Sequence, residues 1–244
     1  MLKIIVVGIE GEINMGFIVR LCKNFNVDEL AIVKPQINPW SEEVKRFAAN
    51  GIDYLYSGRV KVYETLDEAL KNIGISACTS GVVSIDGIDI LRRAIELSEF
   101  ADIATRYSNV AVVFGRESVG LTRDEISKCD LLVHIASNPE YPILNLSHAV
   151  GITLYVLYKS LKKPSILNKI DKVHEEQLHI LDKYVEALAS IVSSNGLQKD
   201  LFTMVFKRLV RRTIVSKSEI GLLITFIRRL YNKVKKVENI NNLD

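Results

Sequence analysis

Three loop-like stretches hold most of the side chains that could do chemistry. They are "TSGVVS" at residues 79–84, "FGRESVGL" at 114–121 and "ASNPEYPILNLSHAVG" at 136–151, and each follows a short apolar run. Gly81 and Gly115 would let the backbone approach a ligand closely. Each loop by itself is typical of a turn or a helix cap, but three such loops at one edge of a sheet would form a binding pocket.

The third loop also contains stiffening and polar residues. Pro139 and Pro142 restrict its backbone, and Asn145 and Ser147 stand where a helix is expected to begin. Ligands of open α/β sheets bind beyond the carboxyl ends of the strands. If the preceding apolar runs are strands, we expect the three loops to lie together at such an edge.

The first loop of the chain argues against a nucleotide enzyme. The opening run "KIIVV" leads into "GIEGEIN", which has Gly8 and Gly11 but lacks the third glycine of the dinucleotide fingerprint. Glu10 and Glu12 stand where a pyrophosphate would approach. The sequence also lacks the lysine motif of a phosphate-binding loop, so nicotinamide and ATP chemistry are disfavoured.

Apolar runs alternate with helical patterns over the first two-thirds of the chain. The runs are nearly continuous in valine, isoleucine and alanine, as in parallel strands that are covered on both faces, and the alternation predicts a doubly wound α/β domain. Strands are expected at Ile4–Val7, Leu30–Val33, Ile75–Thr79, Val110–Phe114 and Leu131–Ile135, and helices at Phe17–Phe25, Glu42–Ala49, Leu66–Lys71, Ile90–Ala104, Asp124–Cys129 and Asn145–Leu161.

The pattern changes at "KKPSILNKIDK", residues 162–172, where a proline and turn formers follow the last α/β element. No strand pattern resumes after it. Apolar residues then recur every three or four positions, "SNG" predicts a helix end, and Ser216 with Glu219 has capping-box spacing. We therefore expect a domain over residues 1–161, a linker over 162–172 and an extension of three helices over 173–244.

The extension holds most of the uneven charge. The formal charge of the whole chain is +3, too small to argue for nucleic acid, but between Lys199 and Lys236 only Asp200 and Glu219 oppose a series of basic residues. A solvated face, or pairing with acids elsewhere, is the plainer interpretation. Concentration of the charge in one appended module favours RNA contact. The predicted contacts are Lys207, Arg208, Arg211, Arg212, Arg228 and Arg229.

The cysteines and the hydropathy pattern bear on the compartment. Cys22, Cys78 and Cys129 are scattered and form no CxxC pair, which fits a reducing compartment and argues against a zinc site. No leader precedes the first strand, and no apolar run approaches the ~18 residues that span a bilayer. We expect a cytoplasmic protein with no metal and no membrane contact.

Three motifs taken together resemble those of the SpoU/TrmH methyltransferases of the SPOUT superfamily. They are "NMGFIVR" at residues 14–20, "FGRESVGL" and "YPILNLSHAVG" at 141–151, in the family's order. The stretches "GEINMGFIVRLCKNFNVDEL" and "NPEYPILNLSHAVGI" are most similar to the TrmJ subgroup. That subgroup carries a C-terminal helical extension, in keeping with the tail of this chain.

The resemblance implies a fold, a cofactor and a reaction. It implies a SPOUT-type parallel sheet with a trefoil knot near its carboxyl end, a homodimer, S-adenosylmethionine as cofactor, and methylation of a ribose 2′-hydroxyl in tRNA. For the TrmJ subgroup the implied target is nucleotide 32 of the anticodon loop, often cytidine. Two alternatives stay open: an rRNA 2′-O-methyltransferase, and a non-catalytic RNA-binding protein of the same fold.

The same resemblance implies which residues meet the cofactor. Gly115 would lie against it, so Gly115→Val is expected to abolish cofactor binding while the fold survives. The implied cofactor contacts are Thr79, Ser80, Gly81, Gly115, Ile135, Pro142, Ile143 and Leu144.

Arg20 is the residue that the resemblance places closest to the reaction. A guanidinium pKa above ~12 makes a base form scarce, so we expect Arg20 to position phosphate and ribose and to stabilise negative charge on the 2′-oxygen. Glu117 is expected to orient other residues, and Asn14 is either a participant or a helix cap. Ile143 stands where many relatives carry serine, and His148 is interpreted as a packed or surface residue. The predicted catalytic set is Arg20, Asn14, Glu117, Asn145 and Ser147.

Overall fold

The computed structural model describes residues 1–83, 89–162, 173–213 and 216–241. It divides into two compact units, Met1–Pro164 and Ser165–Asp244. Most of the predicted linker, residues 163–172, lies outside the described residues.

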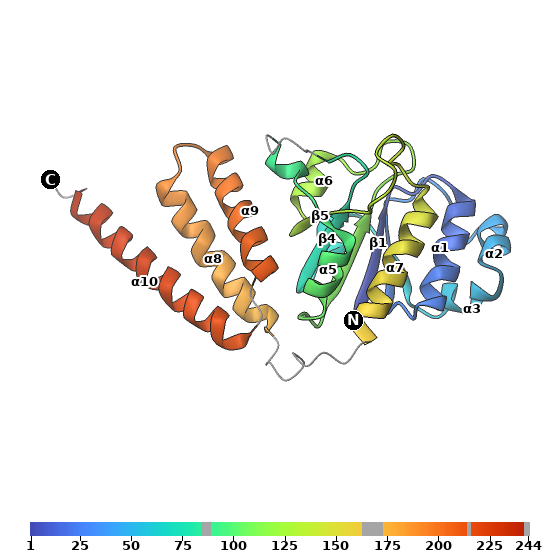
Figure 1. The fold of residues 1–244 in the computed structure, drawn as a ribbon, viewed down its shortest axis with the longest axis horizontal. Coiled ribbons are helices and arrows are strands. Elements are labelled where there is room, and N and C mark those ends of the chain that lie inside the picture. The colour runs from blue at the N-terminus through green and yellow to red at the C-terminus, as the bar shows by residue number, and fades with distance from the viewer. Residues whose placement is uncertain (84–88, 163–172, 214–215, 242–244) are drawn as a thin grey trace. The chain divides into compact units, whose positions relative to one another are not determined.

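A seven-stranded parallel sheet forms the centre of the first unit (Figure 1), in the order β3-β2-β1-β6-β4-β7-β5. Every residue of the central strands β1 and β6 is buried, as the continuous apolar runs predict. The bounds are β1 Leu2–Val7, β2 Glu29–Val33, β3 Val60–Tyr63, β4 Ile75–Thr79, β5 Ile95–Glu96, β6 Val110–Phe114 and β7 Leu131–His134.

The five predicted strands are confirmed, and two strands were missed. β3 is an edge strand whose middle residues Lys61 and Val62 are exposed, so it has no continuous apolar run. The predicted helix Ile90–Ala104 is wrong in its first half. Ile95 instead pairs with Val133 of β7, so hydrogen bonding to the sheet prevails there over local helix propensity.

Helices α1, α7 and α5 lie side by side over one face of this sheet (Figure 1), and α2 packs against α1. The other predicted helices of the unit are confirmed to within two residues of their ends, except that α1 begins at Glu12, more than a turn before the predicted Phe17. The bounds are α1 Glu12–Asn24, α2 Glu42–Ala48, η1 Ala49–Gly51, α3 Ile52–Leu55, α4 Leu66–Ala69, η2 Ile90–Arg92, α5 Leu97–Ala104, α6 Arg123–Ser127 and α7 Leu146–Lys162.

The order of the strands decides where the three loops meet. β6, β4 and β7 are neighbours and parallel, so their carboxyl ends share one edge of the sheet. The loops predicted to form a pocket follow these three strands. The trefoil knot implied by the resemblance stays a prediction.

The second unit is a three-helix arrangement in which α8 packs against both α9 and α10. The predicted cap is confirmed, because the backbone N–H of Glu219 donates to Ser216 Oγ over 3.2 Å. Within the ranges that the structure describes, no helix is long and apolar enough to cross a membrane. The bounds are α8 Glu175–Val192, α9 Gly196–Thr213 and α10 Lys217–Asn241.

Cys78 and Cys129 form a disulfide between β4 and the residues that precede β7, and Cys22 is free and buried. The two bonded cysteines are 51 residues apart, and the β4–β7 pairing brings them together. Because two of the three cysteines are paired, the cysteine pattern no longer argues for a reducing compartment.

An ion cluster centred on the buried residues Lys3 and Glu29 joins β1, β2 and β3. Lys3 Nζ lies 3.0 Å from Glu29 Oε1 and donates to the carbonyl of Ala69, while Lys61 Nζ lies 2.6 Å from Glu29 Oε2. The hydroxyl of Tyr63 donates to Glu29 Oε1 over 2.8 Å. Burial alone would raise the pKa of Glu29, but hydrogen bonds from Lys61, Lys3 and Tyr63 outweigh it and lower the pKa below its ordinary value.

Glu29→Gln is expected to lower the free energy of unfolding by about 3–5 kcal/mol, because it leaves the buried ammonium of Lys3 without its anion. Since the folded-state pKa of Glu29 is lowered, its contribution should be complete above the ordinary glutamate value of about 4.3. It should disappear as pH falls through the lowered pKa. Urea unfolding over a pH series that starts at pH 7 and falls through the ordinary glutamate value tests both statements. The exposed Glu64→Gln is the control, and an equal effect of both variants at pH 7 would contradict the prediction.

Candidate active site

The three predicted loops meet around one cavity of about 350 Å³ at the carboxyl ends of β4, β6 and β7. This volume is in the range of sites for small molecules. All the predicted cofactor residues line it, although their contact with a cofactor stays a prediction. They are Thr79, Ser80, Gly81, Gly115, Ile135, Pro142, Ile143 and Leu144.

The walls of the cavity combine an apolar interior with exposed backbone. Leu121 and Ile126 are almost fully buried and form part of the lining. Gly81 faces the third loop, because a β-carbon there would lie 3.3 Å from Ile143 Cγ1. Such a cavity can hold a flat apolar ring that has polar groups at its edges. A side chain in place of Gly81 would narrow the cavity.

Gly115 lines the cavity, and the loop around it also requires a glycine at this position. A β-carbon at this position would lie 2.2 Å from the carbonyl carbon of Gly120 and 2.4 Å from the nitrogen of Leu121. These atoms belong to the loop itself, which is closed by hydrogen bonds between Arg116 and Gly120 in both directions. Gly115→Val would therefore displace the backbone of the loop itself, and survival of the rest of the fold stays a prediction.

The side chain of Arg116 stabilises this loop by contacts within the loop and with α6. Its guanidinium makes two hydrogen bonds of 3.0 Å to the carboxylate of Glu125, which raise the pKa of Arg116. It also packs under Gly8, where a β-carbon would lie 2.7 Å from Arg116 Nε. The arginine of "FGRESVGL" is thus committed to the loop's own structure.

Glu117 extends from the β6 loop to the start of α1. Its carboxylate accepts hydrogen bonds from the backbone N–H groups of Glu10 and Gly11 over 3.0 and 3.1 Å, and from Asn14 Nδ2 over 3.0 Å. Gly11 is the N-cap of α1 and offers no side chain for capping. Glu117 therefore places a negative charge at a helix N-terminus, where it is favourable.

Asn14 continues this network into α7. It lies inside α1, so the helix-cap interpretation is wrong, and its Oδ1 accepts from Asn145 Nδ2 over 3.1 Å. Asn145 Oδ1 in turn accepts from the backbone N–H of Ser147 over 2.9 Å and from its hydroxyl over 2.7 Å. Four of the five predicted catalytic residues thus form one hydrogen-bonded chain: Glu117, Asn14, Asn145 and Ser147.

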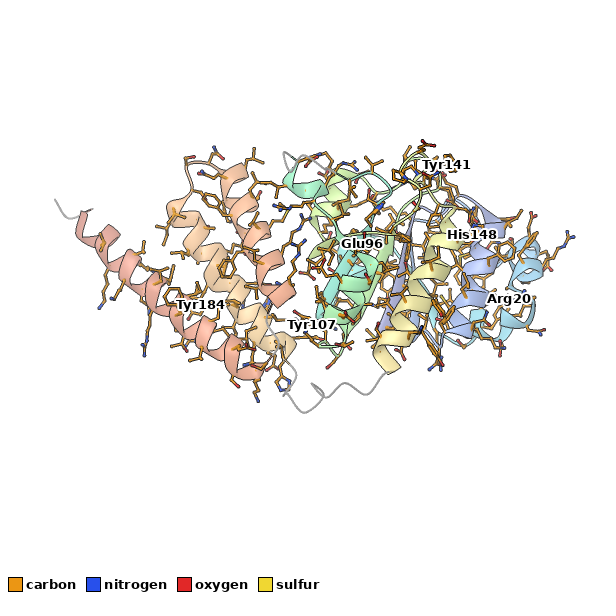
Figure 2. The ribbon with its side chains drawn as sticks, viewed as in Figure 1. Arg20, Glu96, Tyr107, Tyr141, His148 and Tyr184 are labelled. Carbon is orange, nitrogen blue, oxygen red and sulfur yellow. A yellow bond between two sulfur atoms is a disulfide. The ribbon has the colours of Figure 1, made fainter. Side chains whose placement is uncertain are left out.

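Arg20 is the fifth, and it lies elsewhere. It is exposed and lines a separate shallow groove between α1 and α7, with Phe17, Ser147, His148 and Ile152. Figure 2 shows Arg20 and His148 on these two neighbouring helices. Ser147 connects this groove to the hydrogen-bonded chain. His148, which the sequence analysis left out of the catalytic set, is exposed and lines the groove. Its neighbours in the chain did not indicate this position.

The predicted RNA contacts divide into two groups. In α9, Arg211 binds Asp182 through hydrogen bonds of 3.1 and 2.8 Å, and Arg208 is buried like Arg211. The plainer interpretation of the basic residues was pairing with acids elsewhere, and Arg211 is paired in this way. Lys207 Nζ lies 3.8 Å from the same carboxylate, and Arg212 is half-buried.

In α10, by contrast, Arg228 and Arg229 are both exposed. The guanidinium of Arg228 lies 5.3 Å from the centre of the Tyr184 ring, which in turn contacts Tyr231 edge-on. A cation beside aromatic rings is a common platform for nucleic acid. The prediction of RNA contact is therefore best supported in α10.

Comparison with known proteins agrees with these features. The model of the SpoU rRNA Methylase family matches residues 1–155. The tRNA (cytidine-2′-O-)-methyltransferase TrmJ of Sulfolobus acidocaldarius is 35% identical over 98% of this chain and 97% of its own. Its namesake in Methanocaldococcus jannaschii is 35% identical over 90% of this chain and 95% of its own.

A solved structure agrees with the fold. The crystal structure of TrmJ from Z. mobilis superposes with a TM-score of 0.66 at 20% identity, covering 94% of this chain and 99% of that one. The family model spans the sheet and all three loops that meet at the cavity. This protein therefore belongs to the SpoU rRNA methylase family.

Proposed function

We propose that this protein is an S-adenosylmethionine-dependent methyltransferase that acts on a ribose 2′-hydroxyl of tRNA, with cytidine 32 of the anticodon loop as its target. The observation that carries the proposal is the single cavity shared by the three loops, beside the hydrogen-bonded chain from Glu117 to Ser147. The names of the two relatives support the substrate class and the methylated atom.

The cavity fits the cofactor. Buried Leu121 and Ile126, with Ile135 and Leu144, offer apolar walls to the adenine ring. Bare Gly81 leaves space that a β-carbon would narrow against Ile143. When bound, the cofactor supplies a methyl group activated by its sulfonium, which makes it an electrophile.

The remaining task is to prepare the ribose hydroxyl. That hydroxyl is a poor nucleophile, so its proton would pass to solvent water as the oxygen takes the methyl group and S-adenosylhomocysteine leaves. The guanidinium of Arg20 can bind the adjacent phosphate and stabilise negative charge on the oxygen. Hydrogen bonds of Glu117, Asn14 and Asn145 fix the relative positions of three segments. These segments are the loop after β6, the start of α1 and the start of α7.

A homodimer is part of this proposal. Ile13, Phe17, Ile152 and Tyr155 are exposed apolar residues on α1 and α7, next to the groove that holds Arg20. Large apolar side chains gathered on one surface are typical of an interaction site. Packing of this face against its copy about a two-fold axis would bring the Arg20 groove of one chain next to α7 of the other.

The test is methyl transfer to tRNA transcripts that differ only at the sugar of nucleotide 32. A transcript with cytidine there should accept a labelled methyl group, and one with 2′-deoxycytidine should accept none. Transfer to the deoxy transcript would mean that a different atom or nucleotide is methylated. Transfer to rRNA in place of tRNA would favour the second enzyme candidate, and binding without any transfer would favour the non-catalytic one.

The exposed arginines of α10 give a separate prediction on RNA affinity. Arg228→Ala with Arg229→Ala should weaken tRNA binding and reduce the slope of log affinity against log salt by up to about two, one for each phosphate that is no longer neutralised. Cofactor affinity should not change. The control is Arg59→Ala with Lys71→Ala. Both residues are exposed and lie near the amino ends of strands β3 and β4, whereas the cavity lies at the carboxyl ends. An equal slope for both double variants would contradict the prediction.

A further inference from the structure

One charged residue of the described cavity lining comes from outside the three loops. Arg92 ends the short helix η2, Ile90–Arg92, and its side chain is 27% exposed. Its Nη1 donates to the carbonyl of Val82 over 3.3 Å, which holds the guanidinium against the β4 loop. The sequence offered no signal for this residue beyond a pair of arginines within the stretch predicted as the helix Ile90–Ala104.

The charge of Arg92 is weakly balanced by its neighbours. Its Nε lies 4.0 Å from Asp89 Oδ2. The carboxylate of Asp89 is bound instead by Arg123, over 2.5 and 3.1 Å. An arginine at 4.0 Å from an already paired carboxylate keeps most of its capacity to bind another anion.

The other cation of the described lining is already committed. Arg116 makes a two-pronged ion pair with Glu125 and supports the loop beneath Gly8. The rest of the wall is backbone, small polar groups, apolar side chains and the carboxylate of Glu117. Arg92 is therefore the lining cation best placed to receive a negatively charged part of a ligand.

We propose that Arg92 binds the carboxylate at the methionine end of the cofactor, and so selects ligands that carry the intact amino acid. This inference rests on the proposed function, because it assumes an S-adenosylmethionine-type ligand in the cavity. The planar fork of a guanidinium matches a carboxylate in a two-pronged contact. An unpaired carboxylate in a partly enclosed cavity would lose hydration without compensation.

The experiment compares two ligands that differ in the amino-acid portion that carries this carboxylate. S-adenosylhomocysteine has the amino acid, and 5′-methylthioadenosine has the same adenosine and sulfur without it. Calorimetry on the full-length protein should show that Arg92→Met weakens binding of S-adenosylhomocysteine by about 10- to 100-fold. Binding of 5′-methylthioadenosine should be unchanged. Arg93→Met, at the exposed neighbouring position, should change neither affinity.

A second variant separates charge from shape. Arg92→Lys keeps the charge but loses the fork, so it should weaken S-adenosylhomocysteine alone, and by less than Arg92→Met does. Equal weakening of both ligands by Arg92→Met would make Arg92 a support for the β4 loop and overturn the inference. Unchanged affinity for both, with weaker tRNA binding, would assign Arg92 to RNA and also overturn it. If the unaltered protein binds neither ligand, the proposed function itself fails.

Discussion

Arg20→Ala should lower the rate of methyl transfer to tRNA by about 10²- to 10³-fold and leave cofactor affinity unchanged. Arg20 lines the groove between α1 and α7, while the predicted cofactor contacts line the separate cavity at the sheet edge. The fold should survive, because the close packing of Gly51 is against the backbone of Arg20, which alanine retains. The loss should appear in kcat more than in KM if the guanidinium acts mainly on the transition state.

Single-turnover transfer and calorimetry with S-adenosylhomocysteine measure the two quantities. Lys23→Ala is the matched control, since Lys23 is another exposed cation of α1 and pairs with Asp53 over 2.7 Å. It should leave both the transfer rate and the cofactor affinity unchanged. If Arg20→Ala reduced cofactor affinity and transfer rate in equal measure, Arg20 would be a structural residue and its proposed role would fail.

Glu117→Ala should reduce methyl transfer by at least about 10²-fold and lower the free energy of unfolding by about 1–3 kcal/mol. The carboxylate binds three N–H donors, at Glu10, Gly11 and Asn14, and two of them belong to the start of α1. Removing it leaves those donors unpaired and frees Asn14 from its partner. A shift of Asn14 would then displace Asn145, which caps the first turn of α7.

Glu117→Gln sharpens this test. Both carboxylate oxygens accept hydrogen bonds from N–H groups, so an amide would turn one of its own N–H groups towards a donor. Its effect on stability should approach that of alanine. Ser118→Ala is the control, because Ser118 is the next residue and bonds only to Glu10 among the partners seen in the described structure. Urea unfolding and transfer rates that match the unaltered protein for Glu117→Gln would contradict this role.

The elements of the central sheet were predictable because their signal is local. β1 and β6 lie in the middle of the sheet, so both faces are buried and the apolar run is unbroken. β3 lies at an edge, β5 has two residues, and neither produces such a run. Periodicity therefore identified the interior of the sheet and missed its margins.

The sequence alone determined which segments form the candidate site. Glycine, proline and polar residues after the runs that become β4, β6 and β7 identified three loops. The resemblance of three motifs to one family then named the predicted cofactor contacts, and these residues line one cavity. Local chemistry carries this information, because a loop at the end of a buried strand has a composition unlike that of the strand.

Only the tertiary structure decided what each residue contacts. Glu117 meets Asn14 across 103 residues of chain and Asn145 meets Asn14 across 131, and these pairs depend on the strand order and the packing of α1 against α7. The Asp182 partner of Arg211 and the place of Arg92 in the cavity have the same origin. Periodicity and composition report on neighbours along the chain, whereas these contacts join segments that only the crossovers of the sheet and the packing of the helices bring together.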